Sequence, residues 1–98
     1  MKYYDWDEVK NAKLKAEREV CFEDVMAAMD EGRVLADIDH PNQILHSGQR
    51  VLVVNINSYI YTVPYVEDDV KIFFKTIYPS RKMTKKYLNL KGENNEIL

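Results

Sequence analysis

The sequence predicts an α+β fold with two N-terminal helices, a three- to four-stranded antiparallel sheet and a C-terminal helix. Apolar residues recur at helical spacing over the first 30 positions, and the repeat changes to a period of two from residue 34. Pro79 then ends the alternating region, and a charged helical segment follows. Because 98 residues form only one hydrophobic core, we expect a single domain over residues 1–91 and a flexible tail over 92–98.

The first helix is expected to run from Asp5 to about Arg18. Asp5 and Glu8 have the spacing of a capping box, in which the N-cap side chain and the third residue bond each other's backbone N–H. Tyr4 and Val9 have the spacing of a hydrophobic staple. The apolar stripe of this helix is narrow and leaves Leu14 outside; it consists of Val9, Ala12, Ala16 and Val20.

The second helix follows directly. Cys21 occupies the N-cap position, where Ser is more usual, and Asp24 can complete a capping box. Gly32 is the expected C-terminal cap. The core-facing residues have the i, i+3, i+4, i+7 spacing of a helix and are Phe22, Val25, Met26 and Met29.

The sheet is predicted from alternating apolar residues and turn residues. A short strand at 33–38 precedes a loop, and strand 50–56 is joined by a tight turn at Asn57-Ser58 to its hairpin partner at 59–67. Pro64 cannot donate a ladder hydrogen bond, so the second hairpin strand is expected to be an edge strand or to carry a bulge.

The last strand is expected at 70–78 and the last helix after Pro79. Ser80 and Thr84 are alternative N-caps for this helix, which has an inward face of Met83, Tyr87 and Leu90. The strand alternates between two faces, and the expected core face comprises Val70, Ile72, Phe74, Thr76 and Tyr78.

Composition excludes several classes of protein. A single cysteine, Cys21, rules out an internal disulfide. The start MKYYDWDEVK has no apolar stretch ahead of its charges, so we expect no signal peptide. No run approaches the ~18 apolar residues of a membrane span. We therefore expect a protein of the reducing cytoplasm, without a membrane partner.

Charge is unevenly distributed along the chain, whose net charge is −2. Residues 1–70 hold seven basic and fourteen acidic side chains, whereas residues 71–91 hold seven basic and no acidic ones. A basic run can be a solvated helix face, but it also permits local binding of a polyanion.

The basic residues crowd the start of the last helix, where the helix dipole disfavours cations by roughly 0.3–1 kcal/mol each. A phosphate there would meet backbone N–H groups, the dipole and several cations together. The segment therefore predicts an oxyanion site, with nucleic acid as the expected ligand. Lys75 and Arg50 are expected to converge on it, and Phe73 and Tyr78 are candidates for stacking a base. The helix cations are Arg81, Lys82, Lys85 and Lys86.

Nearly the whole chain resembles the BrnT-type toxins of bacterial type II toxin–antitoxin modules. The segment WDEVKNAKLKAEREVCFEDV is similar to the start of that family, GQRVLVV to its middle strand, and IYPSRKMTKKYL to its Ser-x-Arg-Lys-x-Thr ending. The positions that carry the resemblance are Trp6, Asp7, Lys10, Arg18, Val20, Phe22, Glu23, Arg50, Arg81, Lys82 and Thr84.

The resemblance implies a RelE-like fold and a ribonuclease that inhibits translation without a metal or another cofactor. It also implies a ribbon-helix-helix antitoxin whose dimer binds two copies of this chain in a heterotetramer. In the family the last helix begins at the threonine, which favours Thr84 as the cap and places Arg81 and Lys82 on the preceding loop. The sequence departs from the family at Cys21, where serine is usual, and in its acidic body.

Cleavage of RNA by its own 2′-OH needs a base, a stabiliser of the pentavalent phosphate and an acid for the leaving 5′-oxygen. Arg81 and Arg50 are the candidate stabilisers of phosphate charge. Lys75 or Lys82 is the candidate for proton transfer, because neighbouring cations favour loss of a proton from an ammonium group. Lys85 and Lys86 are expected to bind the RNA, together with Tyr78 and Phe73.

Other interpretations remain open at this point. His40 can act as a proton shuttle or be an ordinary loop residue, and Trp6 can anchor the core or stack a base. A metal nuclease would use Asp37, Asp39 and His40, with His46 nearby. A non-catalytic binding module would instead use the basic helix to hold an acidic protein segment, or DNA in a repressor complex.

Overall fold

The computed structural model describes residues 2–45 and 47–88 and confirms the α+β class. Leu90, His46 and the expected tail at 92–98 lie outside these residues. The helices are α1 (Glu8–Arg18), α2 (Phe22–Asp30) and α3 (Arg81–Leu88). The strands are β1 (Tyr3–Asp5), β2 (Val34–Asp39), β3 (Arg50–Ile56), β4 (Tyr59–Glu67), β5 (Lys71–Phe74) and β6 (Tyr78–Pro79).

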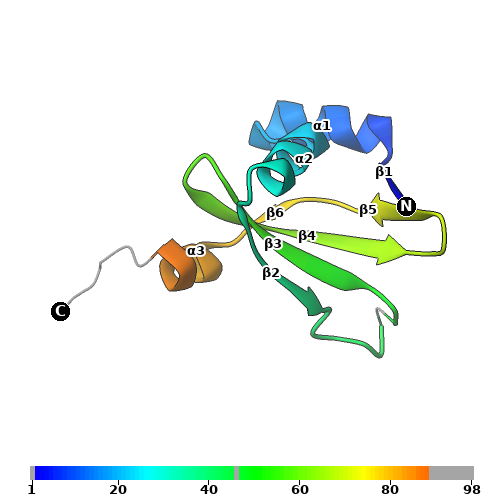
Figure 1. Ribbon diagram of the computed structural model, residues 1–98. Helices are drawn as coiled ribbons and strands as arrows, with labels where there is room; N and C mark the ends of the chain where they lie inside the picture. The colour runs from blue at the N-terminus through cyan, green and yellow to red at the C-terminus, as the bar shows by residue number, and fades with distance from the viewer. Residues whose placement is uncertain (1, 46, 89–98) are drawn as a thin grey trace.

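The described strands form one six-stranded sheet in the order β1-β5-β4-β3-β2, with β6 also paired to β4. The expectation of three to four antiparallel strands was wrong in two respects. The sheet is larger, and it is mixed, because β1 pairs with β5 in parallel. Helices α1 and α2 lie over one face of the sheet, and α3 lies near the opposite end from β1 (Figure 1).

Helix α1 begins later than expected because the residues around Asp5 form a strand. Asp7 is the N-cap, and its carboxylate accepts hydrogen bonds from the backbone N–H groups of Val9 and Lys10 at 2.8 and 3.4 Å. The expected stripe was also wrong, since Val9 is 80% exposed and Leu14 only 3%. The start at Asp7 frees Asp5 to pair with Phe73 of β5.

Helix α2 has the predicted caps. The Asp24 carboxylate accepts from the Cys21 backbone N–H at 3.0 Å, as a capping box requires. Gly32 has a φ of +75°, and its N–H bonds the Met29 carbonyl while Arg33 N–H bonds that of Ala28. These two bonds form a Schellman cap, for which glycine is suited because it adopts positive φ without strain.

The core lies between α1, α2 and the sheet. Phe22 and Phe74 are its largest fully buried side chains, and their rings stack at 5.9 Å between centroids. Trp6 stacks on both rings, at 5.6 and 6.2 Å, so it anchors the core. The buried side chain of Asn11 joins the two helices, because it accepts from Phe22 N–H at 2.7 Å and donates to Glu23 at 2.8 Å. Its donation lowers the pKa of Glu23.

The hairpin of β3 and β4 has the predicted boundaries, and Asn57 and Ser58 form its turn with φ values of 54° and 64°. Of the two alternatives for Pro64, the edge strand was wrong, because β4 lies inside the sheet. The register of β4 shifts by one residue between the Tyr65–Phe74 pair and the Thr62–Tyr78 pair, so an irregularity of the expected kind lies opposite Pro64. The carbonyl of Pro64 accepts from Lys75 N–H at 2.8 Å, so its ring nitrogen also faces residues 75–77. That segment belongs to neither β5 nor β6, so the missing donor interrupts no regular ladder.

The same interruption changes the expected alternation of residues 70–78. Phe74, Thr76 and Ile77 are all buried, whereas Tyr78 is 48% exposed and Val70 is exposed. Residues 75–77 therefore do not follow the period of two that a continuous strand would impose.

Helix α3 begins at Arg81, not at Thr84. Ser80 is its N-cap, with Oγ accepting from Met83 N–H at 3.2 Å. Thr84 is buried in the second turn, where its hydroxyl donates to the Ser80 carbonyl at 2.7 Å and accepts from Ile60 N–H at 2.9 Å. Thr84 thus fastens α3 to β4, and Arg81 and Lys82 lie in the first helical turn instead of on a loop.

No helix within residues 2–45 and 47–88 has the length and apolar character needed to cross a bilayer.

Candidate functional site

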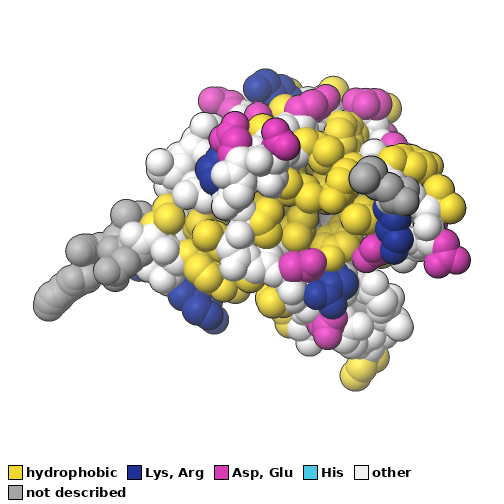
Figure 2. All heavy atoms as spheres, in the orientation of Figure 1, with side chains coloured by type: hydrophobic (Ala, Val, Ile, Leu, Met, Phe, Trp, Pro, Cys, Tyr) yellow, Lys and Arg dark blue, Asp and Glu magenta, His cyan; other side chains and the backbone are white. Residues whose placement is uncertain are grey.

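The cations of α3 form an exposed band. Arg81, Lys82, Lys85 and Lys86 fall within about 140° of the helix circumference, because one residue turns an α-helix by about 100°. None of them forms an ion pair within the described part of the chain, whose ion pairs all lie elsewhere. Figure 2 shows acidic side chains gathered over α1 and α2 and Lys or Arg side chains at α3. The band therefore presents positive charge that no ion pair of the described residues compensates.

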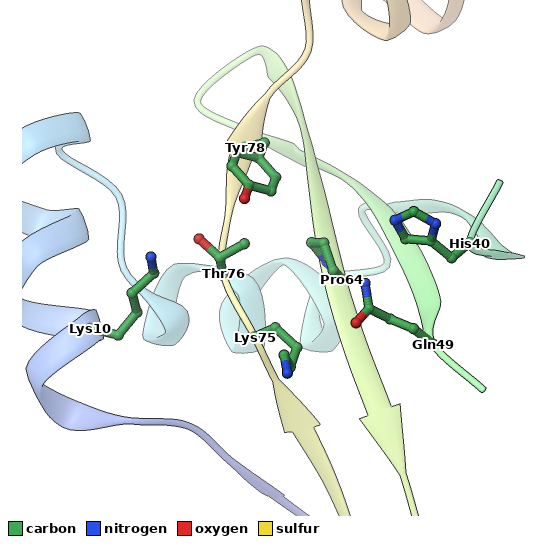
Figure 3. A pocket seen from close by; sticks show the side chains of 7 residues that line it. All are labelled: Lys10, His40, Gln49, Pro64, Lys75, Thr76 and Tyr78. Atoms are coloured by element: carbon green, nitrogen blue, oxygen red, sulfur yellow. The ribbon is translucent and has the colours of Figure 1, made fainter. Parts of the chain in front are cut away.

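A cavity of about 450 Å³ lies where residues 75–77 interrupt the sheet. It is lined by Lys10, His40, Gln49, Pro64, Lys75, Thr76 and Tyr78 (Figure 3). These residues come from α1, the two ends of the connection between β2 and β3, the middle of β4, the segment before β6, and β6 itself. Pro64 tolerates the interruption, because it has no N–H to donate to residues 75–77, and it also lines the cavity.

Tyr78 connects the cavity to the start of α3. Its backbone pairs with Thr62 of β4, and the Arg18 guanidinium lies over its ring at 5.3 Å from the ring centroid. Arg18 also donates to the Ile77 carbonyl, which fixes the end of α1 beside this strand. A half-exposed aromatic ring can stack a nucleobase, but Arg18 already lies over the Tyr78 ring, so the stacking role of Tyr78 stays a prediction.

The structure brings together only some of the predicted site residues. Lys75 lines the cavity, and Arg81 and Lys82 follow Tyr78 within four positions of the chain. Phe73 does not line the cavity; it pairs with Val66 and Asp5, and its ring contacts the Lys71 ammonium at 5.6 Å from the centroid.

Arg50 lies apart from the cations of α3. Arg50 pairs with Tyr65 of β4, whereas α3 contacts β4 at Ile60. These two positions of β4 are five residues apart, which corresponds to about 17 Å along a strand. The Arg50 guanidinium contacts the carboxylates of Asp37 and Asp39 at 3.2 and 2.5 Å and the Tyr65 hydroxyl at 3.2 Å. The expected convergence of Arg50 with the basic helix is therefore not seen.

The Arg50 cluster is self-contained. The Tyr65 hydroxyl also donates to Asp37 at 2.8 Å. Burial and this carboxylate raise the pKa of Tyr65 to about 12, and the Tyr65 hydroxyl and Asp37 raise the pKa of Arg50. The cluster holds one positive and two negative charges, so Arg50 has no excess positive charge to offer a phosphate.

The residues of the metal-nuclease alternative are also occupied. Asp37 and Asp39 bind Arg50, and His40 Nδ1 accepts from the Asn42 backbone N–H at 3.0 Å. Over residues 2–45 and 47–88, no group of three or more His, Cys, Asp or Glu side chains is arranged to hold a metal ion.

An apolar groove of about 220 Å³ continues from the cavity along the sheet to α3. His40, Pro64 and Tyr78 line both hollows, and Met83 of α3 closes the far end. The remaining lining comes from β2, β3, β4 and the following loop: Ile38, Pro41, Val51, Val53 and Thr62. The cationic cavity therefore adjoins the apolar groove, and the groove adjoins the basic helix α3.

Sequence reasoning missed Lys10 and Thr76 as site residues. Lys10 is distant in sequence from residues 75–78, and only the fold brings α1 to this margin of the sheet. The one sequence feature that could have marked Lys10 as a site residue is its place in the opening segment that resembles the BrnT-type family. Thr76 was expected only to face the core, and nothing local distinguishes it from a packing residue.

Comparisons with known proteins give no match to this chain among protein-family models, curated proteins or solved structures.

Proposed function

We propose that this chain is the toxin of a type II toxin–antitoxin module and acts in the cytoplasm as a RelE-like, metal-independent ribonuclease that inhibits translation. The observation that carries the proposal is the succession of three features: a cationic cavity, the half-exposed Tyr78 and the basic band of α3, which forms no ion pair with the described residues. Together these features can hold the backbone and one base of a single-stranded RNA. The resemblance to BrnT-type toxins supports the same class.

The chemistry would proceed by attack of the RNA 2′-oxygen on the adjacent phosphorus. The 2′-hydroxyl loses its proton to a base, the new P–O bond forms, and the P–O5′ bond breaks as the 5′-oxygen gains a proton. Arg81 and Lys82 would stabilise the negative charge of the phosphate, aided by the N-terminus of α3. Lys75 is the candidate for proton transfer because it lines the cavity.

The first test removes the two cations at the start of α3. We expect Arg81→Ala together with Lys82→Ala to abolish growth arrest on induction in bacteria. Both side chains are exposed, so the free energy of unfolding should change by no more than about 0.5 kcal/mol. Growth curves, loss of cellular RNA and thermal melting measure these effects.

A matched control is the pair Lys13→Ala and Lys15→Ala, which removes equal charge from the exposed surface of α1. It should leave toxicity unchanged. Full toxicity of the α3 double variant would contradict the site assignment.

The metal-nuclease alternative predicts a different response to chelation. We expect RNA cleavage by the purified protein to continue in excess EDTA, because the carboxylates that a metal would need are bound to Arg50. If EDTA stops cleavage and magnesium or manganese restores it, the site must be moved to Asp37, Asp39 and His40.

The proposal also includes a ribbon-helix-helix antitoxin, two copies of which would join two copies of this chain. The apolar groove beside α3 and the basic band would suit an amphipathic, acidic segment of that partner, which would block phosphate access. Co-expression with the product of the adjacent open reading frame should restore growth and yield a heterotetramer by light scattering. A chain that arrests no growth and retains no neighbouring product would contradict both parts.

The non-catalytic alternative is favoured by one observation, the continuity of the groove with the basic band, because a binding module needs only such a surface. It would hold an acidic protein segment, or DNA in a repressor complex. This alternative predicts binding without RNA loss or growth arrest, so the induction experiment separates the two functions.

A further inference from the structure

We propose that the cavity beside α1 binds a phosphate group through the Thr76 hydroxyl and the Lys10 ammonium. The inference deepens the proposed function by giving one RNA phosphate a position. It concerns binding alone, however, so it can stand when cleavage fails.

The first argument is the state of the Thr76 hydroxyl. Thr76 is 7% exposed, and its Oγ1 is buried with no hydrogen-bond partner in the part of the chain that the structure describes. An unpaired buried hydroxyl costs about 1–3 kcal/mol. Valine would fill a similar volume without this cost. An acceptor in the cavity would remove the penalty, because the Thr76 side chain lines that space and its hydroxyl can change direction by rotation about χ1.

The second argument is the position of Lys10. In Figure 3 the ammonium end of Lys10 and the Thr76 hydroxyl point toward one another, and the Tyr78 hydroxyl points into the same space. Lys10 forms no ion pair within residues 2–45 and 47–88. Its backbone is fixed because its N–H is bonded to the Asp7 cap. In this arrangement the Lys10 ammonium faces the unpaired hydroxyl and has no ion-pair partner among the described residues.

The third argument is the match to phosphate chemistry. A phosphate presents several acceptor oxygens in different directions, which suits an ammonium and two hydroxyls approaching from α1 and from the sheet margin. Lys75 lines the same cavity and adds a second positive charge. At about 450 Å³ the cavity is also large enough for the sugar attached to a phosphodiester, with Tyr78 available to the base.

Binding can be measured by NMR or calorimetric titration of the full chain with two probes. One is inorganic phosphate; the other is a dinucleoside monophosphate whose 2′-O-methyl group prevents cleavage. We expect both to bind, and we expect Thr76→Val and Lys10→Gln each to weaken binding by about tenfold, as loss of a hydrogen bond to a charged group implies. Thr76→Val should keep or raise the melting temperature, because it removes the unpaired hydroxyl.

Two matched variants serve as controls. Lys13→Gln removes the same charge from an exposed position on α1, and Thr62→Val removes a hydroxyl that lines the apolar groove. Each should bind the probes within about twofold of the unchanged protein.

The outcomes separate this inference from the proposed ribonuclease. Binding of both probes without RNA cleavage would support the phosphate site and contradict the enzyme. Binding of inorganic phosphate alone would support the site and exclude an RNA phosphodiester as its occupant. No binding, or binding that Thr76→Val leaves unchanged while its melting temperature falls, would overturn the inference and leave Thr76 a packing residue.

Discussion

Arg50 and the cations of α3 differ in how the fold treats positive charge. Arg50 contacts two carboxylates and the hydroxyl of Tyr65, whereas the four cations of α3 have no ion pair among the described residues. The sequence marks both as strong phosphate ligands. Within residues 2–45 and 47–88, carboxylates compensate the charge of Arg50 and do not compensate the cations of α3.

This difference indicates where binding energy for an anion is available. A phosphate approaching Arg50 would have to compete with Asp37 and Asp39, which already receive its hydrogen bonds. A phosphate approaching Arg81 or Lys82 would compete with no ion pair of the described residues and would meet the positive end of the helix dipole. Charge compensation therefore separates a structural arginine from cations suited to bind a ligand.

The largest expected effect concerns the anchoring of the uncompensated region. Thr84→Val should destabilise the protein by about 2 kcal/mol, because it leaves the buried Ile60 N–H without an acceptor and removes a bond to the Ser80 carbonyl. Urea unfolding measures the change. Thr62→Val is the matched control, since its hydroxyl makes only a long contact of 3.5 Å, and it should change stability by less than about 0.5 kcal/mol.

Toxicity of the Thr84→Val protein sharpens the comparison. If the direction of the α3 cations matters, toxicity should fall even at temperatures where the variant remains folded. Equal stability of the two threonine variants would show that α3 is held by its other contacts.

The next effect compares the two cation regions directly. Arg50→Ala should lower the melting temperature, because Asp37, Asp39 and Tyr65 lose their shared partner, and it should leave most of the toxicity in place. Lys82→Ala should leave the melting temperature in place and remove most of the toxicity. Loss of toxicity in a stable Arg50→Ala protein would restore Arg50 as a stabiliser of the transition state.

The elements that could be predicted from the sequence are those set by neighbouring residues. The hairpin of β3 and β4 was predicted with its boundaries because its alternation and its Asn57-Ser58 turn are both local. The cap of α2 at Cys21 and its end at Gly32 were predicted for the same reason. The basic character of α3 is likewise a property of consecutive residues.

The errors have a common physical cause in contacts between distant parts of the chain. Both Asp5 and Asp7 can cap a helix, and the choice depends on the pairing of β1 with β5, which lies more than 60 positions away. Pro64 suggested an edge strand or a bulge; β4 is an internal strand, and the neighbouring segment at 75–77 interrupts its own pairing at that point. Local sequence patterns therefore cannot predict pairing with such distant segments.

The candidate site also contains residues that could be predicted from the sequence and residues that only the fold brings together. Arg81 and Lys82 were found from their charge, whereas the compensation of Arg50 depends on β2 and β4. Lys10 and Thr76 emerge only when α1 is placed beside the interrupted strand. A cavity and an unpaired hydroxyl are properties of the packed chain, so sequence patterns cannot show them.

The smallest expected effect is a loss of stability at alkaline pH, which would show that the Arg50 cluster stabilises the fold. The pKa of Tyr65 is about 12 in the folded protein and about 10 in an unfolded chain, so folding favours its protonated form. Its contribution to stability is therefore complete below pH 10 and is lost as the pH rises from 10 to 12. Because its partner Asp37 is partly exposed to solvent, the loss should be only about 1 kcal/mol. Urea unfolding of the unchanged protein and Tyr65→Phe from pH 8 to 11.5 should show the stability advantage of tyrosine shrinking above pH 10. A constant difference over this range would mean that Tyr65 titrates normally and that its bond to Asp37 adds little to the fold.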